Sequence, residues 1–126
     1  MMDPSEVERA IKKLQYQVKT LGEAIDYKNH PIEALIMQMD WGEGDIDRVH
    51  DVFEKWDKIL KSGTKMSSGA FEREFSTMGI NYQTLKSVIL SLYRNGQWTS
   101  VCEAYVDSFG DAPSMEYHGI MRRERE

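Results

Sequence analysis

Three ionisable residues, Asp47, His50 and Glu54, are spaced three and four positions apart, so on a helix they share one face. Carboxylates and histidines on helix faces bind metal ions in some four-helix bundles. Such sites also need a second Glu-x-x-His set and further carboxylates, and no other predicted helix carries a matching histidine. We therefore interpret the three residues as weak metal candidates on a solvated acidic face, and we predict no cofactor.

Other residues that could take part in catalysis or metal binding give weaker signals. Cys102 lies on the apolar side of a predicted helix, and no Cys/His pairing can be argued from spacing, so we interpret it as a core residue. The segment from Lys61 to Glu74 resembles a calcium-binding loop only superficially, because lysine, glycine or serine stands where aspartates would coordinate the ion. No catalytic residues are predicted.

An acidic segment runs from Asp40 to Asp57, with seven acidic residues against Arg48 and Lys55. A surface of this kind attracts a basic protein partner and speeds the encounter. The alternative is that the acidic residues solvate the outer face of a helix and favour its N-terminus, and this alternative is preferred.

The apolar spacing predicts an all-α protein, a multi-helical bundle of about five or six helices, because no alternation with a period of two appears. Met37 and Met39 lie in an apolar helix and are interpreted as core residues. Prolines, glycines and capping residues mark the helix ends. The expected helices begin at Asp3 or Ser5, Pro31, Asp45, Ser67 or Ser68, Asn81 and Thr99, of which Asp45, Asn81 and Thr99 are expected to be N-caps. They end near Tyr27, Met39, Gly63, Gly79, Asn95 and Gly110, with Asn95-Gly96 as a left-handed C-cap.

The first of these helices is long and carries an apolar heptad seam. Its apolar residues alternate four and three positions apart, which is the spacing of a coiled coil. An isolated helix cannot bury such a stripe, so a partner helix is expected. The predicted oligomer interface consists of Val7, Ile11, Leu14, Val18, Leu21 and Ile25.

Small or uncharged residues flank most of the seam, among them Ala10, Gln15, Gln17 and Gly22. The β-branched and leucine positions resemble a parallel two-stranded zipper, but a free-standing zipper would carry pairing charges at these flanks. We therefore expect the helix to be shared between an intrachain core and a subunit interface. The alternative is the first helix of a monomeric bundle.

The chain of 126 residues suits a single helical domain over 1–110, followed by a C-terminal extension over 111–126. The extension contains the apolar residues Met115, Tyr117, Ile120 and Met121. We expect contacts with a neighbouring subunit to order the extension.

A single cysteine points to the reducing cytoplasm. No apolar leader or membrane-spanning run is visible, so secretion and membrane spanning are not expected.

Nucleic-acid binding is disfavoured by the net charge of −5. The last two predicted helices resemble a helix-turn-helix in spacing. However, the segment from Thr99 to Phe109 carries Glu103 and Asp107 and no lysine or arginine, which would repel phosphate. A DNA-binding regulator is therefore the least favoured class.

The order of the elements resembles the YhaI-like family of small helical Bacillus-type proteins. The resemblance rests on the heptad helix, the step from Asp26 to Pro31 with its apolar helix, the helix after Asp45, and the run from Leu92 to Trp98. It covers about residues 5 to 107 and implies an all-helical fold of unknown function, with no catalytic or ligand-binding residues to transfer.

These observations predict a cytoplasmic, homo-oligomeric helical protein that acts as an interaction or regulatory module without catalysis. A small metal-binding or enzymatic helical bundle is the alternative.

Overall fold

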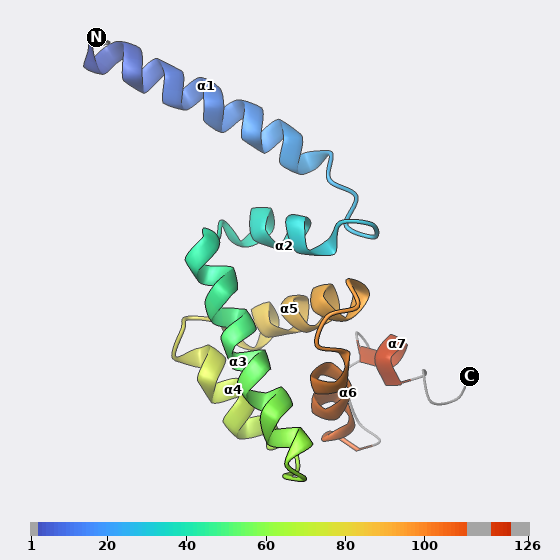
Figure 1. Cartoon of the computed structure of the whole chain (residues 1–126). Helices are drawn as coiled ribbons and strands as arrows, with labels where there is room; N and C mark the ends of the chain where they lie inside the picture. Colours follow the sequence, from blue (N-terminus) through green and yellow to red (C-terminus); the bar gives the residue numbers. More distant parts are fainter. Residues whose placement is uncertain (1–2, 111–116, 122–126) are drawn as a thin grey trace.

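The computed structural model describes residues 3–110 and 117–121, and this part of the chain forms α-helices and no strand (Figure 1). The predicted all-α fold is thereby confirmed. The helices are α1 (Pro4–Glu23), α2 (Pro31–Met39), α3 (Glu43–Lys61), α4 (Ser68–Ser76), α5 (Tyr82–Arg94), α6 (Thr99–Asp107) and α7 (His118–Met121).

Side-chain caps begin three of the helices where the sequence predicts them. Asp3, Ser67 and Asn81 each accept a hydrogen bond from the backbone N–H three residues later, at 2.9, 3.3 and 2.9 Å respectively. Each bond satisfies one of the N–H groups that a helix start leaves without an intrahelical partner. The turn after α5 is also as predicted, since Gly96 has a left-handed backbone with φ of 71°.

Other helix ends differ from the prediction. Asp45 does not begin α3 as its cap. The helix starts two residues earlier, and the Asp45 carboxylate accepts the N–H of Gly42 at 2.8 Å from the first turn. Likewise, α6 follows Trp98, whose backbone is left-handed with φ of 52°, so Thr99 is a helical residue and not the cap.

An aromatic cluster forms the centre of the body, which comprises the helices from α2 onward. The ring of Phe71 meets Phe53, Phe75 and Tyr105 at centroid distances of 5.4, 5.0 and 5.1 Å. These side chains come from α3, α4 and α6, so the cluster joins three helices. Edge-to-face aromatic pairs contribute about 0.5–1.5 kcal/mol each beyond the burial of their area. Leu35, Val49, Leu85, Val88, Ile89, Leu92, Val101 and Val106 surround the cluster.

Two glutamates of the short helix α4 hold it to its neighbours. Glu72 accepts a hydrogen bond from the Tyr105 hydroxyl of α6 at 2.5 Å. Glu74 accepts one from the Trp56 indole of α3 and also pairs with Lys55. Hydrogen bonds to charged acceptors are stronger than neutral ones, so these contacts fix α4 between α3 and α6.

The described residues of the C-terminal extension pack on the body of the same chain. Tyr117 and Ile120 are buried, and the Tyr117 ring lies edge-on to Tyr105 at 6.0 Å. The core therefore includes residues beyond Gly110. Met115 lies outside the described residues, and the ordering of the extension by subunit contacts stays a prediction.

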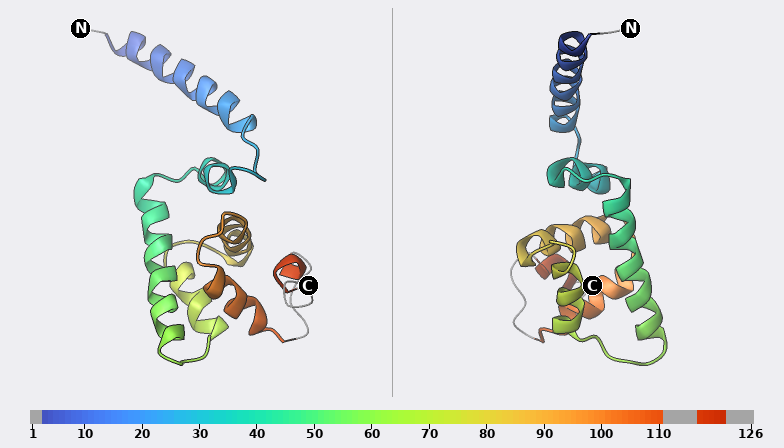
Figure 2. Two further views of the ribbon diagram at one scale, coloured as in Figure 1. Left: turned by 45° about the vertical axis from the view of Figure 1, so that its right-hand side comes forward. Right: turned by 90° about the vertical axis from the view of Figure 1, so that its left-hand side faces the viewer.

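Helix α1 projects away from the body, as the three views in Figures 1 and 2 show. It is the longest helix, with 20 residues, and none of them is buried. The expectation that α1 shares an intrachain core is therefore wrong. The apolar stripe of α1 takes no part in the core of the body, which is complete without it.

Candidate interaction surface

The heptad seam of α1 is open along its length. Five of the six predicted interface residues lie on the helix, with exposed fractions from 41% to 70%. Exposed single apolar residues are common, whereas a continuous apolar stripe marks an interaction site. We use the name seam for these five residues: Val7, Ile11, Leu14, Val18 and Leu21.

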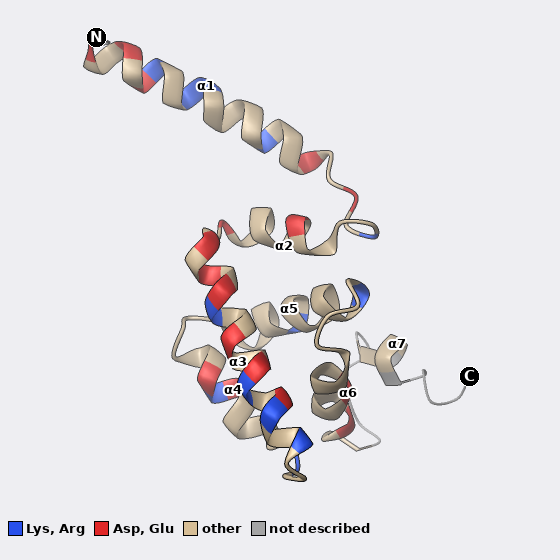
Figure 3. Ribbon diagram, in the orientation of Figure 1, with Lys and Arg blue, Asp and Glu red and all other residues tan. Residues whose placement is uncertain are grey.

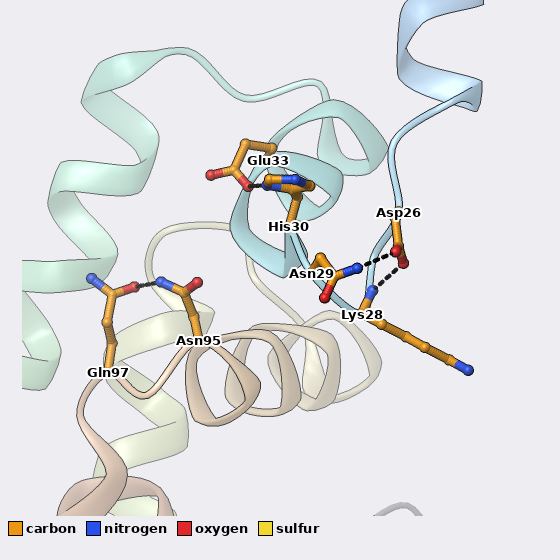
Figure 4. Close-up of polar contacts among 7 residues, drawn as sticks. All are labelled: Asp26, Lys28, Asn29, His30, Glu33, Asn95 and Gln97. Carbon is orange, nitrogen blue, oxygen red and sulfur yellow. Dashed lines mark hydrogen bonds and ion pairs between the residues drawn. The ribbon is translucent and has the colours of Figure 1, made fainter.

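The sixth predicted interface residue, Ile25, lies beyond the end of α1 at Glu23 and is half-buried. The helix stops because a turn competes with it. The Asp26 carboxylate accepts hydrogen bonds from the backbone N–H of Lys28 at 2.9 Å and from the Asn29 amide at 2.6 Å (Figure 4). Aspartates in this role offer the backbone an alternative to the helix. The first bond is the main reason that the pKa of Asp26 is lowered.

A groove lies between α1 and α2. The two helices cross and splay apart toward the N-terminus of α1 (Figures 1 and 2). Near the linker they come close, because a Cβ atom on Gly22 would stand 3.1 Å from the Cε atom of Met37. The open part has a volume of about 450 Å³. Its lining consists of Ile11, Leu14, Gln15, Val18, Lys19, Met37 and Asp40.

Met37 was predicted as a core residue, and this prediction is wrong. Its side chain is 38% exposed and lines the groove, whereas Met39 packs against the core. The difference follows from the helix register, since Leu35 and Met39 are four residues apart on the face toward α5, and Met37 lies between them. That spacing is the sequence signal that would have placed Met37 outside the core.

The linker between α1 and α2 is anchored to the body. The Arg94 guanidinium of α5 lies over the Tyr27 ring at 6.0 Å from its centroid, within the range of a cation–π contact. At the start of α2, the exposed His30 Nδ1 atom lies 3.5 Å from a carboxylate oxygen of Glu33 (Figure 4). The Tyr27–Arg94 contact therefore joins the linker to α5.

The acidic segment from Asp40 to Asp57 divides into two parts along α3 (Figure 3). Toward the end of the helix, Glu54 and Asp57 pair with Lys58 and Lys61 at 3.4 and 2.7 Å. Near its start only Asp45 is paired, with Arg48. Of the carboxylates in residues 40–51, all of which the structure describes, four form no ion pair, and we call them the acidic corner: Asp40, Glu43, Asp47 and Asp51.

The three weak metal candidates do not form a metal centre in the described structure. The His50 Nδ1 atom accepts a hydrogen bond from the Trp98 indole at 2.9 Å, and Glu54 pairs with Lys58. Across residues 3–110 and 117–121, no group of three or more His, Cys, Asp or Glu side chains is arranged to hold an ion. The structure therefore gives His50 a role in packing.

Cys102 is fully buried on α6, and burial raises the pKa of its thiol to about 12. A thiol with a raised pKa forms little of the thiolate that acts as a nucleophile. The interpretation of Cys102 as a core residue is confirmed.

Among the described residues, none of the helices combines the length and apolar character that crossing a bilayer requires. Comparison with family models, with curated proteins and with solved structures finds no match to this chain. The resemblance to the YhaI-like family stays a prediction. The surface with the clearest capacity for binding is therefore the seam together with its groove.

Proposed function

We propose that this protein is a homo-oligomeric interaction module that associates through the seam of α1. The observation that carries the proposal is the exposure of the seam on a helix that buries no residue in its own chain. A second copy presents the same stripe, and coiled-coil packing inserts the residues of one stripe between those of the other.

The flanks of the seam support self-association in a bundle of helices. Ala10, Gln17 and Gly22 beside the seam carry no charge, so like charges do not meet at these three flanking positions and two helices can approach at short range. Leu14 and Leu21, with exposed fractions of 58% and 70%, offer the largest apolar surface for the contact.

The proposal assigns no catalytic role and places the module in the cytoplasm. The half-buried carboxylates of Glu72 and Glu74 are engaged in holding α4 to its neighbours. The single cysteine, Cys102, is buried in the core, as suits a protein of a reducing compartment.

The test is the mass of the full chain in solution, measured by light scattering, for the wild type and for the double variant Leu14→Asp, Leu21→Asp. We expect the wild type to be an oligomer and the variant a monomer, because each aspartate would put a charge into the seam. The body of the variant should melt as the wild-type body does, since α1 buries no residue.

A matched control is the double variant Tyr16→Gln, Thr20→Gln, which changes the face of α1 opposite the seam without altering the charge of the helix. This variant should keep the wild-type mass. A monomeric wild type, or a Leu14→Asp, Leu21→Asp variant with unchanged mass, would contradict the proposed function.

A further inference from the structure

The charge on α1 is concentrated in its middle. Residues 9–19 contain Arg9, Lys12, Lys13 and Lys19 and no acidic residue, and we call this segment the basic stretch. Lys12 pairs with Glu8 at 3.3 Å, whereas the other three form no ion pair within the described part of the chain. The helix that carries the seam therefore has three unpaired cations in this stretch, Arg9, Lys13 and Lys19.

The acidic corner has the opposite character. Residues 40–51 contain five acidic residues and one arginine, and the four carboxylates of the corner are exposed. Asp40 lines the groove between α1 and α2, and α3 begins three residues later with Glu43 (Figure 3). One apolar groove is thus bordered by negative charge at its α2–α3 end.

We propose that the groove between α1 and α2 receives α1 of a second copy, and that the basic stretch of that helix pairs with the acidic corner of the first. This inference rests on the proposed function and specifies its contact. Ile11, Leu14 and Val18 of one copy, with Met37 of α2, form the apolar wall against which the entering seam packs. Opposite charges at the border favour the encounter and fix its register.

Symmetry makes the pairing occur twice. In a twofold contact, each α1 lies in the groove of the other copy, so the same residues meet at both ends.

Two contacts define the base of the groove. Close approach at Gly22 and Met37 sets one end of the splayed pair, and the Tyr27 contact with Arg94 holds the linker on α5. The remaining opening is lined mainly by apolar side chains and fits a helix better than a polar ligand.

Two charge-reversal variants of the full chain test the inference. The first is Lys12→Glu, Lys19→Glu on α1, and the second is Glu43→Lys, Asp47→Lys at the acidic corner. Each variant alone brings like charges together, so its self-association constant should weaken by about tenfold or more. When the two are mixed, opposite charges meet at both ends, and a mixed oligomer of near wild-type affinity should form.

The control is Lys58→Glu, Lys61→Glu, which makes the same charge change at the far end of α3. It should associate as the wild type does. Native mass spectrometry distinguishes the mixed oligomer when one variant carries an isotope label. If both reversal variants associate as tightly as the wild type, or if mixing restores nothing, this inference fails while the proposed function stands. A monomeric wild type would overturn both.

Discussion

The indole N–H of Trp98 donates a hydrogen bond to Nδ1 of His50 at 2.9 Å, across 48 residues of sequence. This contact joins the turn between α5 and α6 to the middle of α3, and the two rings lie 6.4 Å apart. Trp98 makes the contact from a left-handed backbone, which is rare for a bulky residue. The hydrogen bond and the packing of the indole hold that conformation in place.

A double-mutant cycle measures the Trp98–His50 contact. Trp98→Phe removes the donor and His50→Phe removes the acceptor, while both keep an aromatic ring. We expect each single variant to lose about 1 kcal/mol of unfolding free energy and the pair to show a coupling of about 0.5–1.5 kcal/mol. Urea denaturation gives all four values. Strictly additive losses would mean that the hydrogen bond does not stabilise the fold.

Tyr105 should make the stability of the protein depend on alkaline pH. Its pKa is raised above the ordinary value near 10, first by burial and second by the hydrogen bond to Glu72. The folded state therefore favours the neutral phenol, whereas the unfolded chain ionises it above about pH 10. The stability from this group is fully present below pH 10 and is lost as the pH rises further.

The measurement is the unfolding free energy of wild type and Tyr105→Phe at several pH values. Above pH 10, the wild type should lose up to about 1.4 kcal/mol per pH unit more than the variant. Tyr16→Phe serves as the control, because Tyr16 is 72% exposed, and it should keep the wild-type slope. Parallel curves for wild type and Tyr105→Phe would contradict the prediction.

Cys102 should react with thiol reagents only when the chain unfolds. Its side chain is buried and the raised pKa suppresses the thiolate at neutral pH. Labelling with an aromatic disulfide reagent should therefore be slow in buffer and rapid in denaturant.

The comparison for this experiment is Ser100→Cys combined with Cys102→Ala, which moves the thiol to an exposed position of the same helix. That variant should react at once in buffer. Fast labelling of wild-type Cys102 without denaturant would show that α6 opens locally.

Local signals in the sequence were sufficient for most of the helices. Pro31, Asn81 and Gly96 stand where the structure begins or ends a helix, because caps and turns act within a few residues. The heptad spacing likewise identified the seam. The features that the sequence did not predict depend on long-range contacts. The left-handed backbone of Trp98 depends on a partner on α3, and the burial of Tyr117 depends on a surface that α6 provides.

The candidate site was predicted in part for the same reason. Spacing defined the seam residues, but it did not show that the body would close its core without them. Nor did it show that Met37 and Asp40 would lie beside the seam, since their position depends on the turn at Asp26. The number of acidic residues in the acidic segment could be read from the sequence. Its division into paired and unpaired carboxylates could be seen only from the side-chain positions.

Because no residue of α1 is buried in its own chain, the stability of this helix should depend on how much of the protein is associated. A lone helix of 20 residues is marginal in water, so dilution should let α1 fray while the body remains folded. Each tenfold rise in the concentration of free copies above the dissociation constant then adds about 1.4 kcal/mol to the order of this helix. The concentration of the protein therefore determines the fraction of chains in which α1 is helical.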